Sequence, residues 1–299
     1  MSKNRRLGKS IICAILAAAV ITAVFAGCKA SSEDNGETPA AAGVTGQISV
    51  VSREDGSGTR DAFTELMGIV DEEGNDNTAA TAEITSSTSV MTATVAGNEK
   101  AIGYVSLGSL SDDVKAVSLD GVAPSTDTVK DGSYKLQRPF VIAYKDGELS
   151  DLAQDFISYI LSADGQAVIE EEGYISTGSE TAYTASGLKG TVTISGSTSV
   201  APVMEVLADK YKELNPEVQI EIQQPGSGAG IEAAIEGAVE IAMSSRELKD
   251  EEKATLTPVQ IALDGIAVIV NNNNDVSNLT AEQIKSIFTG ETTAWEDVK

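Results

Sequence analysis

The sequence predicts an α/β fold, and three observations support this prediction. Short apolar runs with strand-like alternation are interleaved with amphipathic runs of helical spacing along most of the chain. Four of the strand-to-helix turns are rich in Ser, Thr and Gly, namely 56–59, 196–199, 226–230 and 244–246. The chain has 299 residues, a length typical of about two domains. Helix N-termini that converge on a crevice of such a fold suit a small, dehydrated oxyanion.

The first turn follows a strand expected at 48–51 and precedes a helical stripe of four apolar residues, Ala62, Phe63, Leu66 and Met67. Ser57 and Thr59 supply hydroxyl donors, and Arg53 supplies a planar fork that matches an oxyanion. Gly58 lets the backbone approach a ligand closely. Asp55 is expected to hold Arg53 through a charge-assisted pair. The alternative is a flexible turn with a surface ion pair.

The remaining elements follow from periodicity. Further strands are expected at 101–107, 115–119, 140–144, 191–194, 218–222, 239–242 and 261–270. Helices are expected at 90–96, within 152–173, at 200–214, in a segment ending at 235, and at 281–288, where Thr280 is the cap. Residues 84–89 lack Arg and have little Gly, so we interpret them as a helix cap. Residues 67–77, 124–135 and 178–190 are expected to be loops, the last a linker.

Charge and composition exclude several classes of function. The formal charge is −24, which argues against nucleic acid and anionic membrane surfaces as partners. The chain contains no His. This absence excludes a Ser-His-Asp mechanism, His-ligated zinc and imidazole acid–base chemistry.

The N-terminus has the pattern of a bacterial lipoprotein signal over residues 1–27. Four basic residues precede an apolar run, 11–25, which is short for a membrane span. Small residues then lead to Cys28, which is expected to become the lipidated first residue of the mature chain. Residues 28–45 are expected to form a flexible tether. An ordinary export signal or an anchor helix is the alternative.

Residues 53–59 (Arg-Glu-Asp-Gly-Ser-Gly-Thr) match a motif of the periplasmic phosphate-binding proteins, the receptor components of phosphate ABC importers. Residues 196–202, 226–230 and 242–246 resemble the other phosphate loops of that family, and the resemblance covers nearly all of 46–299. It implies a two-lobed, type II periplasmic-binding-protein fold in which each lobe is a sheet flanked by helices. The family roles imply these phosphate-binding residues: Arg53, Ser57, Gly58, Thr59, Thr198, Ser199, Ser227 and Ser245, with Asp55 supporting Arg53.

Two features depart from the family pattern. Ser245 stands where some members have an Asp that accepts the proton of hydrogen phosphate and helps to reject sulfate. A hydroxyl can also accept, but the basis of selectivity changes. The order of the loops is also reversed, and joining Lys299 to Gly46 would restore the family order. The chain therefore resembles a circular permutant, with a fragment of a longer tandem protein as the alternative.

The resemblance implies one lobe from 46–137 plus 259–299 and a second lobe from 138–258, which contains the 178–190 linker. Phosphate would bind between them, and the lobes would close on it.

The function expected from this resemblance is that of a monomeric receptor, lipid-anchored on the extracytoplasmic face of the bacterial membrane. It would capture inorganic phosphate and pass it to an ABC permease, with no cofactor, no metal and no enzymatic step. Alternatives are a receptor for sulfate or molybdate, and a phosphate sensor that does not transport. A serine hydrolase is disfavoured, because neither Ser57 nor Ser227 lies in Gly-x-Ser-x-Gly and no His is present to act as the base.

Overall fold

The computed structural model describes residues 43–298, which belong to one compact unit, 41–299. The predicted signal peptide, Cys28 and most of the predicted tether lie outside these residues. Within the described part, helices are too short or too polar to cross a membrane.

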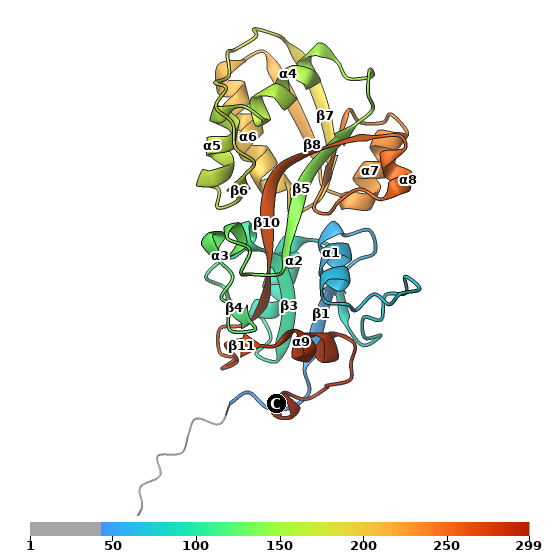
Figure 1. Ribbon diagram of the computed structural model, residues 1–299, viewed down its shortest axis with the longest axis vertical. Coiled ribbons are helices and arrows are strands. Elements are labelled where there is room, and N and C mark those ends of the chain that lie inside the picture. The colour runs from blue at the N-terminus through green and yellow to red at the C-terminus, as the bar shows by residue number, and fades with distance from the viewer. Residues whose placement is uncertain (1–42, 299) are drawn as a thin grey trace, which may run out of the picture. The chain divides into compact units, whose positions relative to one another are not determined.

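The described residues form an alternation of strands and helices (Figure 1). The strands are β1 (Ser49–Arg53), β2 (Glu83–Thr85), β3 (Ala101–Ser106), β4 (Val114–Leu119), β5 (Gln137–Tyr144), β6 (Ile175–Ser176), β7 (Gly190–Gly196), β8 (Val218–Gln223), β9 (Ile241–Ser244), β10 (Thr257–Asn271) and β11 (Asn278–Leu279). The α-helices are α1 (Gly58–Leu66), α2 (Thr88–Ala96), α3 (Thr126–Lys130), α4 (Asp151–Ile160), α5 (Ala163–Glu171), α6 (Ala201–Leu214), α7 (Ser227–Ile235), α8 (Asp250–Lys253) and α9 (Ala281–Phe288). Two short 3-10 helices are η1 (Leu107–Ser109) and η2 (Trp295–Asp297).

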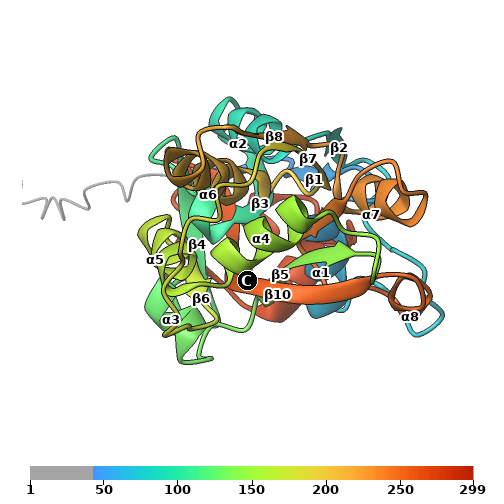
Figure 2. The same cartoon turned by 90° about the horizontal axis from the view of Figure 1, so that it is seen from above.

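One long strand joins the two ends of a mixed sheet. The main path runs β2-β1-β3-β10-β5-β9-β7-β8. The first part of β10 pairs antiparallel with β5, and its second part pairs antiparallel with β3 and β4. The outer pairs β1–β2, β1–β3, β7–β8 and β7–β9 are parallel. Figures 1 and 2 both show β5 and β10 side by side, and Figure 1 shows them linking the two groups of helices.

The buried apolar side chains form separate clusters at the two ends of this sheet. One cluster gathers residues of 48–136 and 266–298, together with Ile175. The other two clusters gather residues of 140–262. We call the elements around these cores the first lobe and the second lobe. On β10 the core changes between Ala262 and Ile266, a few residues after the boundary expected at 258/259.

A buried ion pair lies where β5 and β10 cross from one lobe to the other. Arg138 Nη2 is 3.0 Å from Asp264 Oδ2, and both residues are at most 2% exposed. Ser106 Oγ donates to the other carboxylate oxygen of Asp264 at 2.9 Å. Breaking a buried pair leaves an uncompensated charge, so this pair restricts the sequence at the crossing point.

Most predicted elements are confirmed, and the differences have local causes. Helix α3 was expected to be loop, because its five residues are too few to show a periodic stripe, although Ser125 and Thr128 form a capping box. Strand β2 was also not predicted, because its three residues are too few to show an alternating pattern. Leu66 is exposed, so it is not part of the buried stripe of α1. The 178–190 segment lacks regular structure up to 189, but the Tyr183 hydroxyl anchors it by donating to Asp155 at 2.6 Å.

The two ends of the folded region are neighbours in the first lobe. Trp295 N donates to the Gly46 carbonyl at 3.0 Å, and Gly46 N donates to Glu296 Oε2 at 2.7 Å. Gln47 forms a β-bridge with Ala294. Circular permutation is tolerated where chain ends lie close together, and the ends of the folded region meet this condition. The permutant interpretation remains a prediction, which the following variant tests.

A chain that starts at Ser179, joins Lys299 to Gly46 and ends at Gly178 should fold. The join lies next to Gly46, whose backbone already contacts Trp295 and Glu296, and the opening leaves the Tyr183 anchor intact. We expect cooperative thermal unfolding within about 5 °C of the parent, because the native contacts are kept. A matched chain with the same join but opened inside β10, between Gly265 and Ile266, should not fold, since it interrupts the strand shared by both lobes. Loss of folding in the first variant would refute the interpretation.

Candidate functional site

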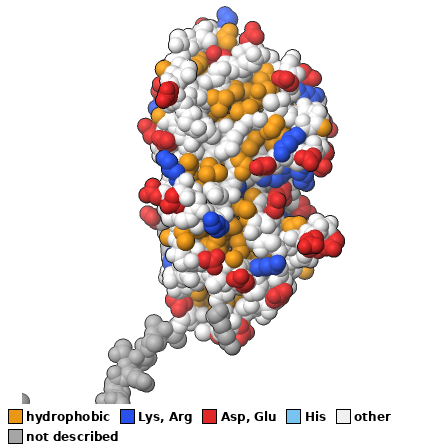
Figure 3. All heavy atoms as spheres, viewed as in Figure 1, with side chains coloured by type: hydrophobic (Ala, Val, Ile, Leu, Met, Phe, Trp, Pro, Cys, Tyr) orange, Lys and Arg blue, Asp and Glu red, His pale blue; other side chains and the backbone are white. Residues whose placement is uncertain are grey.

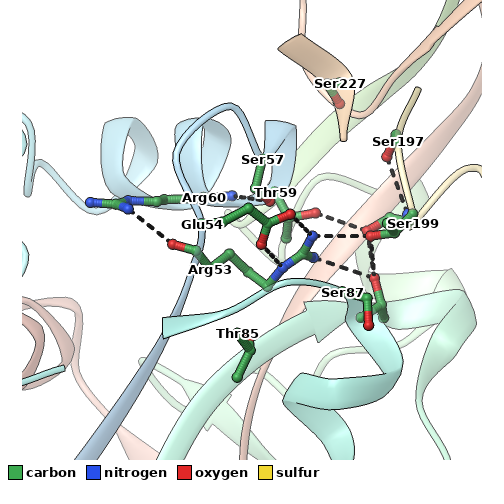
Figure 4. A network of polar contacts seen from close by, with 12 residues as sticks. Arg53, Glu54, Ser57, Thr59, Arg60, Thr85, Ser87, Ser197, Ser199 and Ser227 are labelled. Carbon is green, nitrogen blue, oxygen red and sulfur yellow. Dashed lines mark hydrogen bonds and ion pairs between the residues drawn. The ribbon is translucent and has the colours of Figure 1, made fainter. Parts of the chain in front are cut away.

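Turns from both lobes meet at the N-termini of several helices. Ser57 caps α1 by accepting from Arg60 N at 3.4 Å, and its own proton stays free to donate. Thr59 Oγ1 lies 2.8 Å from Ser199 Oγ of the second lobe. Gly228 N donates to the Gly56 carbonyl at 2.9 Å. Figure 4 shows Thr59 and Ser199 pointing toward one another from the two lobes. The lobes are therefore in direct contact through hydroxyls and peptide groups.

Arg53 lies at the centre of this contact and is 2% exposed. Its Nε and Nη2 donate to the two carboxylate oxygens of Glu54 at 2.8 and 2.7 Å. Nη2 also donates to Thr198 Oγ1 at 3.0 Å. Behind it, the Tyr104 hydroxyl accepts from Arg53 N at 3.2 Å. Burial raises the pKa of Tyr104 to about 12, so this support stays protonated and uncharged at neutral pH.

The expected pair between Asp55 and Arg53 is not formed. Asp55 lies in the turn before α1 with its side chain 96% exposed, and it pairs with Arg60 at 2.8 Å. Glu54, which directly follows the end of β1, orients Arg53 instead. The side chains of Glu54 and Asp55 point in different directions because β1 ends at Arg53 and the chain turns there.

Ser227 and Ser245 come together in the second lobe, and both are fully buried. Ser245 N donates to Ser227 Oγ at 3.2 Å, and the two hydroxyl oxygens are 3.5 Å apart. Gly226 precedes them with φ of 107°, a conformation that favours glycine. Gly58 of the first lobe lies against the pair, because a Cβ there would be 2.4 Å from Ser227 Oγ.

Thr88 joins this group from a segment that we expected to be only a helix cap. Ser87 does cap α2, accepting from Val90 N at 3.2 Å. Thr88 Oγ1, however, lies 3.2 Å from both Thr198 Oγ1 and Ser199 Oγ. The available signal was the run of hydroxyl residues at 85–89, which β2 places beside β1.

A cleft of about 750 Å³ lies beside this cluster and is lined by residues of both lobes. Thr88 and Thr198 form part of its wall, together with side chains of α2 and with Gln224. The buried polar cluster is thus adjacent to a space that small solutes can occupy.

An ionic group closes the other edge of the contact. Arg246 Nε donates to Asp61 of the first lobe at 2.8 Å, and its Nη1 and Nη2 donate to Glu252 at 2.8 Å each. Burial disfavours the charges of Arg246 and Glu252, but their mutual hydrogen bonds raise the pKa of Arg246 and lower that of Glu252. Arg246 and Glu252 therefore stay ionised at neutral pH.

These groups suit the binding of an anion without chemical change. The site offers the buried guanidinium of Arg53 and many neutral hydroxyl and peptide donors. In residues 43–298, His, Cys, Asp and Glu are not grouped so as to hold a metal ion. Of the residues expected from sequence, Arg53, Ser57, Gly58, Thr59, Thr198, Ser199, Ser227 and Ser245 all lie in this buried contact.

Comparisons with known proteins agree on the family. The sequence model of the "PBP superfamily domain" matches residues 4–164 and 181–299. "Phosphate-binding protein PstS 2" of Streptococcus agalactiae serotype V is 46% identical over 280 residues, covering 92% of this chain and 93% of the relative. A solved structure of a phosphate-binding protein of a phosphate ABC transporter from Streptococcus pneumoniae is 50% identical, with a TM-score of 0.69, covering 85% of this chain and all of that one. "Phosphate-binding protein PstS" of Staphylococcus haemolyticus is 40% identical over 119 residues, 37% of this chain and 38% of the relative. The resemblance to phosphate-binding proteins and the α/β fold are confirmed.

Replacing Gly58 by Ala should oppose closure of the lobes. Gly58 is the first residue of α1, so Ala suits its backbone, but the new Cβ overlaps Ser227 Oγ and lies 2.9 Å from Ser245 Oγ. Such overpacking costs about 1–3 kcal/mol. Small-angle X-ray scattering with inorganic phosphate should show compaction in the parent and less compaction in Gly58→Ala. Gly97→Ala is the control, because its nearest neighbour would be 3.3 Å away, within α2. Equal compaction of all three proteins would contradict this interpretation.

Proposed function

We propose, from the premise that this chain belongs to the family of PBP superfamily domains, that the protein captures inorganic phosphate and delivers it to an ABC import permease. The observation that carries the proposal is the buried Arg53 guanidinium, which is held by Glu54 on one edge and surrounded by hydroxyls from both lobes. Phosphate is a tetrahedral oxyanion with many acceptor sites, and such donors match it. The site binds and releases its ligand without a chemical step.

The phosphate ligands in this proposal are those expected from sequence. Arg53, Ser57, Gly58 and Thr59 bind from the first lobe. From the second lobe, Thr198, Ser199, Ser227 and Ser245 bind through hydroxyls or N–H groups. Glu54 replaces Asp55 as the residue that orients Arg53. The acidic protein can still attract an anion here, because helix N-termini and one Arg determine the local field.

The two lobes of the proposal are 46–137 plus 259–299 and 138–258, and they close on the ligand about the crossing strands β5 and β10. The separate apolar cores support this division. The permutant interpretation stays a prediction; what supports it is the contact of Gly46 with Trp295 and Glu296 in the first lobe.

The proposed location is the extracytoplasmic face of the membrane, where the protein acts as a monomer. Its anchor would be a lipid on Cys28 after removal of 1–27, and the charged face in Figure 3, where acidic and basic side chains are interspersed, would remain in solution. Cys28→Ala should release the protein into the medium or periplasm. Unchanged membrane association of that variant would refute the anchor.

Arg53→Ala should abolish or greatly weaken phosphate binding. Its charge-assisted hydrogen bonds are buried, so we expect a loss of about 2 kcal/mol or more, roughly 30-fold in Kd. Titration calorimetry with inorganic phosphate measures this effect. Lys210→Ala removes the same charge from an exposed ion pair on α6 and should leave Kd unchanged. Parent-like affinity in Arg53→Ala would rule out the proposed site.

Ser245→Asp should penalise sulfate more than phosphate at pH 7. A carboxylate can accept the proton of hydrogen phosphate, whereas sulfate has no such proton and would face a like charge. Competition calorimetry with sulfate and molybdate also tests the alternative oxyanions for the parent protein. If the variant loses affinity for phosphate and sulfate equally, Ser245 does not contact the protonated oxygen. If the parent protein binds sulfate or molybdate more tightly than phosphate, that anion is the ligand instead of phosphate.

A further inference from the structure

The geometry of Arg53 indicates where its anion binds. A guanidinium has five N–H donors in one plane and presents them along its edges. Glu54 occupies the edge made by Nε and Nη2. The edge made by Nη1 and Nη2 faces two hydroxyls, Thr198 Oγ1 at 3.0 Å and Thr88 Oγ1 at 3.5 Å. An anion that binds Arg53 with two hydrogen bonds must therefore approach on the side of Thr88.

Thr88 is connected to both lobes at this edge. Its Oγ1 lies 3.2 Å from Thr198 Oγ1 and 3.2 Å from Ser199 Oγ, two hydroxyls that the proposed function already assigns to phosphate. Thr88 is 7% exposed and also lines the cleft of about 750 Å³. It thus stands between the guanidinium and the space from which a solute reaches it.

The position of Thr88 at the start of α2 is a second reason to expect an anion beside it. It is the first residue of the helix after the cap, Ser87, where the partial positive charge of the helix N-terminus is concentrated. A threonine hydroxyl donates one hydrogen bond and accepts others. With Ser at 245, the buried cluster holds no carboxylate at that position, so a hydroxyl that can both donate and accept suits the mixed protonation of phosphate at neutral pH.

We propose that Thr88 is a direct phosphate ligand, which makes α2 a further helix N-terminus in the site. The proposal rests on the proposed function, because it assigns a residue to the same phosphate. Thr88 donates its hydroxyl proton to the oxygen that lies against Nη1 of Arg53. Thr198 and Ser199, whose hydroxyls lie 3.2 Å from Thr88 Oγ1, would share this phosphate with Thr88.

The test compares four full-length chains by titration calorimetry with inorganic phosphate: the parent, Thr88→Val, Thr88→Ser and Thr94→Val. Valine keeps the shape of threonine and removes the hydroxyl, so we expect Kd to rise about 10-fold or more. Serine keeps the hydroxyl and should stay within about 3-fold of the parent. Thr94 lies on the same helix but outside the residues that line the cleft, so Thr94→Val is the matched control and should bind as the parent does.

Thermal unfolding without phosphate separates binding from folding, because a purely structural role would lower the midpoint of Thr88→Val without reducing its upward shift by phosphate. If Thr88→Val does not fold, Thr88→Ala takes its place. A crystal structure of the parent with phosphate gives an independent answer: we expect Thr88 Oγ1 at hydrogen-bond distance from a phosphate oxygen. Parent-like Kd in Thr88→Val, or a phosphate more than about 4 Å from Thr88 Oγ1, overturns the inference. A parent that does not bind phosphate refutes the proposed function instead.

Discussion

The Arg53 guanidinium is almost wholly removed from water, and a buried charge must be compensated by neighbouring groups. Glu54 compensates part of it, and hydroxyls from both lobes surround the remaining edge. This requirement explains why turns that are distant in the sequence meet at one point. It also explains how a chain of charge −24 can present a cation to an anion: the field at the site depends on one side chain and nearby helix ends, since distant surface charges are screened.

The contacts between the lobes are of a kind that a ligand can replace. Hydroxyl pairs such as Thr59–Ser199 and Thr88–Thr198 are neutral and individually weak. An oxyanion that accepts from both partners of such a pair makes stronger, charge-assisted bonds with each lobe. A ligand with differential contacts in the closed state shifts the equilibrium toward it. The ion pair between Arg246 and Asp61 also joins the two lobes, at the edge of their contact.

The crossing strands carry a second buried pair of charges. Arg138 and Asp264 are paired where β5 and β10 pass between lobes, and Ser106 of the first lobe contributes a hydrogen bond. A buried pair at this point ties the two strands together. The Arg138–Asp264 pair thus lies at the crossing strands, whereas the Arg53–Glu54 pair lies in the contact between the lobes.

The sequence by itself determined the alternation of strands and helices, the four hydroxyl-rich turns and the importance of Arg53. These features are local, because periodicity, caps and turn residues act over a few positions. Short elements such as α3 and β2 were missed, since a few residues carry no measurable period. Their stability comes from neighbours that are distant in the chain.

Only the tertiary structure decided which carboxylate serves Arg53 and which further hydroxyl reaches it. Glu54 and Asp55 are adjacent in sequence, and the direction in which the chain leaves β1 separates them. Thr88 belongs to a segment that looks like an ordinary cap, and it enters the site because β2 pairs with β1 and brings α2 beside the second lobe. Contacts of this kind depend on packing between segments, and packing is a property of the folded chain that no short stretch of sequence contains.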